Sequence, residues 1–355
     1  WGIAYTFPHV KTGIVARIEG TSPGRRIALR SDMDALPITE KTGLDFSSRN
    51  QGVMHACGHD MHMASLLGTI RVLDQLKDEI RGEILFVFQP GEEMNPGGAK
   101  LMLEEGVFKG RQPDMIIAQH VLPEMETGYV GFRSGIYMAS TDEIYIRVKG
   151  KGGHAALRQD IKDPVLMASS ILLSLQEKIM QMSPEKVPTV LSFGKVLADG
   201  AVNVIPDAVI LEGTFRTMNE EWRKEAHWLI KDIASDIASG MGGTVDVEIK
   251  NGYPVLRNHE QLTREARSMA TSLLGKEHVE DMEIRMTAED FAWFTRDIPG
   301  FLYRLGVKDP VGEKSFPLHS PMFKANESAL RTGISIMSYL AIELLKIKAV
   351  EKINP

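Results

Sequence analysis

Residues 82–93 read GEILFVFQPGEE, and this stretch determines how the chain is expected to fold. Its first part is an almost continuous apolar run, which is typical of a strand buried on both faces of a sheet. Pro90 and Gly91 then break the strand, and two adjacent glutamates, Glu92 and Glu93, follow. Two carboxylates held this close repel each other unless a cation neutralises them. The stretch therefore predicts a sheet strand with a charged site at its carboxyl end.

Similar strands alternate with helical patterns over the first 140 residues. Residues 12–20 and 25–32 are rich in β-forming side chains, and residues 113–120 (PDMIIAQH) contain another apolar run. Between them, residues 62–78 place Leu and Ile at helical spacing. Buried strands that alternate with helices predict an α/β fold around a mostly parallel sheet, of the phosphorylase or hydrolase-like type.

The pattern changes at about residue 141. Residues 142–150 (DEIYIRVKG) alternate strictly between apolar and polar side chains, as in an antiparallel strand with one buried face. The following segments, with helices at 164–182 and about 220–239, give a β-α-β-β-α-β order. We expect residues 141–250 to form a small inserted ferredoxin-like α+β domain. Residues 1–140 and 251–355 would then form a larger, discontinuous domain.

Composition excludes several classes of function. The hydrophobic content of 43% and charged content of 25% are typical of a globular protein. A net charge of −6 with no long basic run gives no basis for nucleic-acid binding. No stretch predicts a membrane span or a signal peptide, so we expect a cytoplasmic location and no membrane partner. The chain begins at Trp1 rather than Met, and we expect a preceding segment to be missing.

Polar residues gather where the predicted strands end, or in loops that could reach the same edge of the sheet. In open α/β sheets this carboxyl edge is where ligands bind. If the segment around the single cysteine is extended, Cys57 and His59 project to the same side. Thiolate, imidazole and carboxylate together are the ligands of zinc and related metals. The side chains concerned are Asp32, Cys57, His59, Glu92, Glu93, His120 and His319.

Other interpretations of these residues are open. Cys57 could act as a nucleophile with His120 or His319 as its base, although Glu92 and Glu93 would then have no role. His55 and His62 could be solvated or could orient their neighbours. The glycine-rich residues 149–157 (KGKGGHAAL) could cradle a phosphate before a helix, but they lack the Gly-Lys-Ser/Thr ending of a P-loop.

Nine ordered blocks resemble a known family. They are LRSDMDALPI (29–38), HACGHDMH (55–62), FQPGEE (88–93), AQHVLP (118–123), GGHAA (152–156), NVIPD (203–207), GTFRT (213–217), AEDFAWF (288–294) and PLHSP (317–321). Together they resemble the co-catalytic metallopeptidase family of aminoacylases, hippurate hydrolases and auxin-conjugate amidohydrolases, in its cysteine-containing branch. The resemblance extends from about Thr12 to the last helix, and it is specific to the family without indicating one substrate.

The resemblance implies a role for each matching residue. Cys57 would be a ligand shared by two divalent metal ions, zinc in the first place, with manganese, nickel or cobalt as alternatives. Glu92 would be the general base, and His154 would reach the substrate carbonyl across a dimer. Asn203 and Arg216 would hold the carboxylate of the substrate. The remaining implied metal ligands are His59, Glu93, His120 and His319.

The resemblance implies an amidohydrolase that cleaves N-acyl amino acids or short peptides with a free carboxylate, as a deacylase or carboxypeptidase. Water held between the metals would attack the amide while Glu92 takes its proton. The resemblance also implies that residues 1–140 and 251–355 form the metal-binding catalytic domain and that residues 141–250 form a dimerisation or lid domain. We therefore expect a homodimer formed through the inserted domain. Where the wider family has a His-x-Asp metal motif, this chain reads Arg30-Ser31-Asp32, so we expect Asp32 to be a structural acid behind the ligands. A relative that binds peptide or metal without catalysis is the non-enzymatic alternative.

Overall fold

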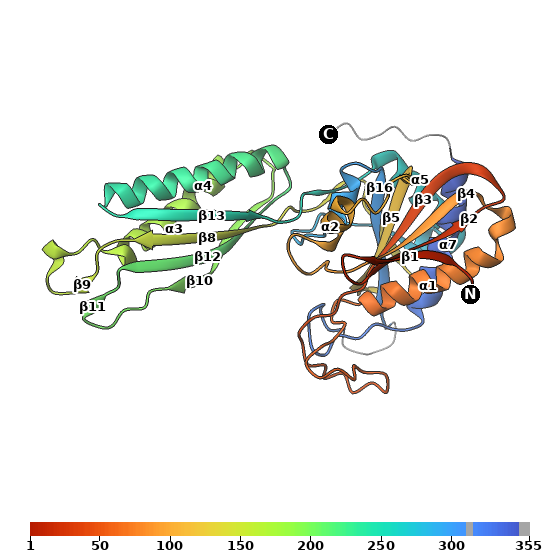
Figure 1. Ribbon diagram of the computed structural model, residues 1–355, viewed down its shortest axis with the longest axis horizontal. Helices are drawn as coiled ribbons and strands as arrows, with labels where there is room; N and C mark the ends of the chain where they lie inside the picture. The colour runs from red at the N-terminus through yellow and green to blue at the C-terminus, as the bar shows by residue number, and fades with distance from the viewer. Residues whose placement is uncertain (310–314, 348–355) are drawn as a thin grey trace. The chain divides into compact units, whose positions relative to one another are not determined.

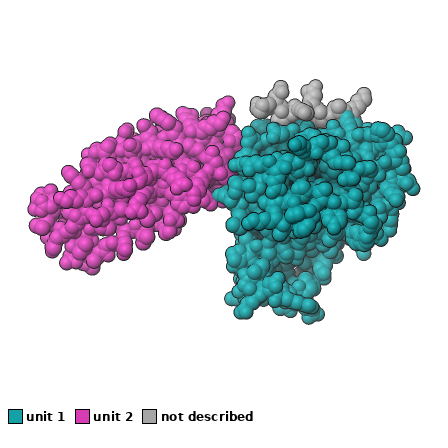
Figure 2. Space-filling view, in the orientation of Figure 1, with its two compact units in different colours: residues 1–137, 256–284, 289–355 teal, residues 138–255, 285–288 magenta. Residues whose placement is uncertain are grey.

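The computed structural model describes residues 1–309 and 315–347 (Figure 1). The chain divides into two compact units, which Figure 2 colours separately. Unit 1 contains Trp1–Tyr137, Leu256–Ile284 and Glu289–Pro355, and unit 2 contains Met138–Val255 and Arg285–Ala288. The short segment Arg285–Ala288 belongs to unit 2, although the sequence had placed it in the larger domain.

An eight-stranded sheet forms the centre of unit 1, in the order β1-β2-β4-β3-β5-β16-β6-β15. Strands β4, β3, β5 and β16 run parallel to one another in its middle, while β1 and β2 add an antiparallel edge. The predicted α/β fold with a large, mostly parallel sheet is confirmed. The strands are β1 (Ala4–His9), β2 (Gly13–Glu19), β3 (Ser22–Asp32), β4 (Arg81–Gln89), β5 (Met115–Glu126), β6 (Val130–Phe132), β15 (Val279–Asp281) and β16 (Gly300–Lys308).

Helices cover this sheet and complete its core (Figure 1). Helices α1 and α7 pack against each other and against β3. The side chains of Ile84, Phe86, Ile117 and Phe301 are completely buried, which explains the continuous apolar runs in these strands. The helices and short elements of unit 1 are α1 (His59–Gln75), η1 (Lys77–Glu79), α2 (Gly98–Glu104), α5 (Glu260–Leu274), η3 (Lys276–His278), α6 (Ala292–Thr295) and α7 (Ala329–Lys346), and β7 (Gly135–Met138) pairs with β14 (Leu256–Asn258).

Unit 2 contains a four-stranded antiparallel sheet in the order β10-β12-β8-β13, with α3 and α4 packed on it. In β8, Ile144, Ile146 and Val148 are buried against the helices, which accounts for the strict alternation of its sequence. The elements follow in β-α-β-β-α-β order. They are β8 (Asp142–Lys149), α3 (Pro164–Met182), β10 (Thr189–Leu197), β12 (Ala208–Thr217), α4 (Glu220–Gly240) and β13 (Thr244–Asn251).

The glycine-rich residues 149–157 do not form a phosphate cradle. Gly153 and His154 make the short strand β9, which pairs with β11 (Val204–Ile205). The short helix η2 (Arg158–Asp160) follows, and α3 begins only at Pro164. A phosphate cradle requires a loop that leads directly into a helix N-terminus, so this alternative is wrong.

Within the part of the chain that the structure describes, no helix is both long enough and apolar enough to span a bilayer.

Candidate metal centre

Strands β3, β4 and β5 bring polar side chains to one edge of the unit 1 sheet. Asp32 is the last residue of β3, and Glu92 and Glu93 follow the end of β4. His120 differs from the expectation, because β5 does not end there but continues to Glu126. Its pairing with β3 stops at Ala118, while its pairing with β16 continues past His120. His120 therefore lies two residues beyond the last β3–β5 pair, at the level of Asp32, the last residue of β3.

The Cys57-Gly58-His59 segment is not extended, so that part of the prediction is wrong. Gly58 has a φ of 77°, and His59 is already the first residue of α1. A Cβ atom at position 58 would collide with the side chain of Val121. Glycine is required here both for the left-handed backbone and for the close approach. The turn nevertheless places the thiol and the imidazole on the same site.

Two histidines are oriented by backbone carbonyl groups. His59 Nδ1 lies 2.9 Å from the carbonyl oxygen of Asp34, and His120 Nδ1 lies 2.8 Å from that of Val121. A carbonyl only accepts, so each Nδ1 carries a proton and each Nε2 is the ring atom left to face the site. Among the described residues, the buried Nε2 of His59 has no hydrogen-bond partner. An unpaired buried polar atom is costly unless a ligand satisfies it, and metal-binding histidines are commonly held in this way.

Two groups of possible metal ligands share the sulfur of Cys57. One consists of Cys57, His59 and His120, and the other of Cys57, Glu93 and His319. Within each group the ligand atoms lie within 4.8 Å of one another. Cys57 Sγ is 3.7 Å from His120 Nε2, and His319 Nε2 is 3.1 Å from Glu93 Oε1. The structure thus brings the five predicted ligands together, and thiolate, imidazole and carboxylate are the kinds of donor that would suit divalent cations.

His319 reaches this site in an unusual backbone conformation. Its φ is 65°, a left-handed value that is uncommon for a residue other than glycine. The N–H of His319 donates to the carbonyl oxygen of Ala56 at 2.8 Å, next to Cys57. Backbone strain of this kind often occurs where a functional side chain must be aimed. The loop is therefore attached directly to the segment that carries the thiol.

Asp32 is held from two sides. His62 Nδ1 lies 2.5 Å from its Oδ1, and Arg30 Nη1 lies 2.8 Å from its Oδ2. His62 Nε2 accepts from the N–H of Val121 at 2.9 Å, so the ring proton of His62 is on Nδ1 and faces Asp32. His62 is thus buried and connects β3 to the backbone beside His120. Neither of the open interpretations of His62 specified this connection.

Two groups of residues in this region were missed by the sequence reasoning. Asp34 accepts from the N–H groups of Glu92 and Glu93 at 3.1 and 2.9 Å. Its place two residues beyond the strand end in SDMD was the only signal in the sequence. Arg30 is completely buried and lies 3.1 Å from Glu289 and 2.8 Å from Asp290. The block AEDFAWF had contributed to the resemblance, but no role had been given to these acids.

Burial and charge shift the pKa values of the central groups. Burial, together with the charges of Glu93 and Glu92, raises the pKa of the Cys57 thiol. Burial also lowers the pKa of His120, the nearest imidazole, well below its usual value. A nucleophilic cysteine needs a thiolate, so the raised pKa of Cys57 disfavours the cysteine-nucleophile mechanism. Burial alone would lower the pKa of His59, but Asp32 and Asp34 outweigh it and raise that pKa to about 9.

The three predicted substrate residues belong to unit 2. His154 is exposed in β9, and the carbonyl oxygen of Asn203 accepts from the N–H of Ala155 at 3.0 Å. Arg216 is partly buried in β12, and its Nη1 donates to the carbonyl oxygen of Met286 at 3.0 Å. Their approach to the metal centre stays a prediction.

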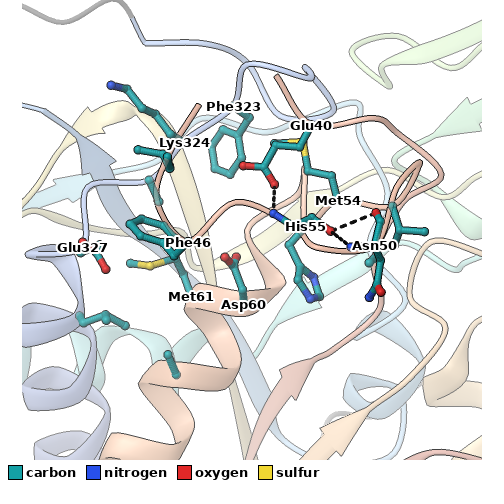
Figure 3. Close-up of a pocket in the computed structure, with 17 residues that line it drawn as sticks. Glu40, Phe46, Asn50, Met54, His55, Asp60, Met61, Phe323, Lys324 and Glu327 are labelled. Carbon is teal, nitrogen blue, oxygen red and sulfur yellow. Dashed lines mark hydrogen bonds between the residues drawn. The ribbon is translucent and has the colours of Figure 1, made fainter. Parts of the chain in front are cut away.

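A cavity of about 430 Å³ lies beside the Cys57–His59 segment (Figure 3). His55 and Asp60, which flank that segment, contribute to its wall together with the apolar side chains of Phe46, Met61 and Phe323. None of the five predicted metal ligands lines it. The cavity is therefore separate from the candidate metal centre.

Comparisons with known proteins agree on one family. Residues 28–343 match the family described as peptidase family M20/M25/M40. An N-acetyldiaminopimelate deacetylase of Geobacillus sp. strain WCH70 is 38% identical over 331 residues, which cover 93% of this chain and 86% of the relative. The deacetylase of the same name from Bacillus subtilis strain 168 is 37% identical over 328 residues, covering 92% of this chain and 85% of the relative.

A solved structure agrees with these sequence relatives. It is that of the YXEP protein of Bacillus subtilis, described as a dinuclear metal-binding peptidase of the M20 family. The TM-score is 0.83 at 35% identity, and the match covers 97% of this chain and 88% of that one.

Cation binding to this centre is expected to tighten as the pH rises. Below a pH of about 9 His59 carries a second proton, and the Cys57 thiol is also protonated, so a bound cation must displace these protons. The apparent affinity should therefore rise by about tenfold per pH unit for each proton displaced. This slope can be measured by competition for the cation with a chromophoric chelator whose own pKa values are known, between about pH 6 and about pH 8. An affinity that is independent of pH would contradict the assignment of these two ligands.

Proposed function

The chain belongs to peptidase family M20/M25/M40 and is a hydrolase, and we propose that it cleaves the amide bond of N-acyl amino acids or short peptides with a free carboxylate. The observation that supports this most directly is the position of Cys57 in two groups of ligand atoms at once. A thiolate between two imidazole- and carboxylate-rich groups suits a dinuclear site, and a dinuclear site suits the hydrolysis of amides.

Five side chains would hold the two divalent ions. They are Cys57, His59, Glu93, His120 and His319. Zinc suits this mixture of thiolate, imidazole and carboxylate best, with manganese, nickel and cobalt as alternatives. When bound there, the ions supply Lewis-acid activation of water and of the scissile carbonyl group.

Glu92 is proposed as the general base. It is buried, with only 7% of its surface exposed, and its carboxylate is grouped with His59 and Glu93. Burial, together with the charges of Glu289 and Asp290, raises its pKa well above the usual value for a glutamate. A carboxylate with a raised pKa is a stronger base, and once protonated it is a competent acid at neutral pH. Glu92 would take a proton from the attacking water and pass it to the nitrogen of the leaving amine.

Arg216 and Asn203 are proposed to bind the substrate carboxylate. In the described part of the chain, the one hydrogen bond of the Arg216 guanidinium is its Nη1 contact with Met286, which leaves its other donors for a ligand. A planar guanidinium binds a carboxylate through two parallel hydrogen bonds. Partial burial makes such a pair stronger than it would be in water. His154 would donate to the carbonyl oxygen as negative charge develops on it.

The relatives indicate which acyl group to test first. The similar proteins from Geobacillus and Bacillus subtilis are named N-acetyldiaminopimelate deacetylases. We propose N-acetyl amino acids, with N-acetyl diamino acids among them, as the first substrates for this chain.

Unit 2 is proposed to form the homodimer. Leu166, Leu173 and Met180 recur every seventh residue on α3, and each is at least 45% exposed. Strand β10 is an edge strand of the unit 2 sheet and carries the exposed Val196 and Leu197. An apolar helix stripe and an open strand edge are both features that pairing with a second copy would cover.

The base assignment predicts a selective loss of turnover. Glu92→Gln keeps the size of the side chain but replaces one carboxylate oxygen by an amide NH2 group and cannot take a proton, so kcat should fall by about 100- to 10,000-fold. The metal content, measured by elemental analysis, should stay at that of the parent protein. Glu124→Gln, an exposed acid on β5, should leave kcat unchanged. Substantial turnover in Glu92→Gln would remove Glu92 from the base role.

The carboxylate assignment predicts a change in specificity. Arg216→Ala should raise the KM of N-acetyl amino acids by about 10- to 100-fold, because a charge-assisted pair is lost. The KM of the corresponding amides should change little. Arg147→Ala, an exposed arginine on the same sheet, serves as the control. Equal effects of Arg216→Ala on acids and amides would show that it does not bind the carboxylate.

The dimer assignment predicts a change in mass. Leu173→Glu places a charge in the middle of the apolar stripe on α3, so sedimentation equilibrium should report a monomer where the parent protein is a dimer. Lys178→Glu, on the same helix but outside the apolar stripe, should leave the mass unchanged. A dimer of unchanged stability in Leu173→Glu would place the interface elsewhere.

A further inference from the structure

The segment that carries Glu92 and Glu93 is a tight loop between two regular elements. Strand β4 ends at Gln89 and helix α2 begins at Gly98. The N–H of Gly98 donates to the carbonyl oxygen of Gly91 at 2.9 Å, and a Cβ atom at position 98 would collide with the carbonyl oxygen of Pro90. The two ends of the loop therefore lie against each other, and the two glutamates project from a closed bend.

One carboxylate, from a distant part of the chain, holds both ends of this loop. Asp290 accepts from Gln89 Nε2 at 2.9 and 2.7 Å, immediately before the loop. It also accepts from the N–H of Ala99 at 2.9 Å, immediately after the loop. Asp290 is completely buried. Hydrogen bonds to a buried carboxylate are strong and directional, so they determine where the loop begins and ends.

The charge of Asp290 is compensated by Arg30, which is buried as well. Arg30 Nη2 lies 2.8 Å from Asp290 Oδ1, and Arg30 Nε donates to Gln89 Oε1 at 2.9 Å. Arg30, Gln89 and Asp290 therefore form a closed set of hydrogen bonds. A fully satisfied buried network of this kind has one well-defined arrangement.

The hydrogen bonds and ion pairs of Asp290 involve none of the five proposed metal ligands in the described structure. Asp34, by contrast, holds the middle of the loop but also contacts His59. A substitution of Asp290 can therefore move the loop without removing a contact from a proposed metal ligand.

We propose that Asp290 is a positioning residue for the general base: it clamps both ends of the Glu92–Glu93 loop and so sets the position of the Glu92 carboxylate. This inference rests on the proposed role of Glu92 and adds a residue that acts through it. Misplacement of a reacting group by about 1 Å costs about 100-fold in rate. Asp290→Asn replaces one acceptor oxygen by a donor that faces other donors, so the clamp should open while the side-chain volume is kept.

The first test measures the loop itself. Hydrogen–deuterium exchange of the full-length protein, as isolated, should show the amides of residues 91–99 exchanging about tenfold faster in Asp290→Asn. Peptides from unit 2 should be unchanged. Asp297→Asn, an exposed acid in the same region, should exchange like the parent protein. Unchanged protection of residues 91–99 in Asp290→Asn would overturn the proposal, and this readout does not depend on the reaction.

The second test asks whether Asp290 acts through Glu92. Asp290→Asn should lower kcat by about 100-fold and leave KM almost unchanged. Combined with Glu92→Gln it should cause little further loss, because a misplaced base no longer matters once the base is absent. Additive losses would show a general structural role and overturn the proposal. If Glu92→Gln alone keeps its turnover, Glu92 is not the base. The exchange experiment would still show whether Asp290 holds the loop in place.

The charge of Asp290 also acts on Glu92, so a variant on the other side of the clamp that keeps this charge separates position from electrostatics. It also covers the case in which Asp290→Asn does not fold. Gln89→Met removes the contact before the loop and leaves Asp290 paired with Arg30 and Ala99. It should give the same local increase in exchange and the same non-additivity with Glu92→Gln. Protection equal to that of the parent protein, or additive losses, would count against the clamp in the same way.

Discussion

The structure of the site depends on how buried acidic side chains are compensated at the carboxyl edge of the unit 1 sheet. Asp32, Glu92, Glu289 and Asp290 each have 7% or less of their surface exposed. Carboxylates buried together are destabilising unless positive charges or hydrogen-bond donors surround them. Arg30 provides one charge inside the protein, and the remaining negative charge around Cys57 and Glu93 is what makes the centre suitable for cations.

The orientation of the proposed ligands follows from the same compensation. Backbone carbonyls take the Nδ1 protons of His59 and His120, so the Nε2 atoms face the centre. His62 has the opposite arrangement, because its Nε2 accepts from a backbone N–H and its Nδ1 faces Asp32. The three neighbouring imidazoles thus serve two purposes: His59 and His120 present Nε2 to the centre, and His62 holds Asp32. The difference arises because backbone carbonyls face His59 and His120, whereas a backbone N–H faces His62.

The chemistry and the recognition of substrate are proposed to come from different units. The ligand atoms, the base and the loop clamp all belong to unit 1, whereas Arg216, Asn203 and His154 belong to unit 2. This division explains why the proposed base can be tested through kcat and the proposed carboxylate partner through KM. Most of the buried charged side chains, among them Arg30, Asp32 and Asp290, belong to unit 1.

The sequence by itself determined the regular elements and the kinds of ligand. The apolar run of β4, the alternation in β8 and the helix at 164–182 depend on local periodicity, which is readable along the chain. The gathering of thiol, imidazole and carboxylate residues suggested a metal site, and the resemblance to a known family assigned the individual ligands. Only the tertiary structure revealed the turn at Gly58, the bond from Asp34 to the Glu92–Glu93 backbone and the link from Asp290 to both ends of that loop. The links from Asp34 and Asp290 join residues far apart in the chain, and the turn at Gly58 depends on the close approach of Val121. Such contacts leave no periodic pattern in the sequence.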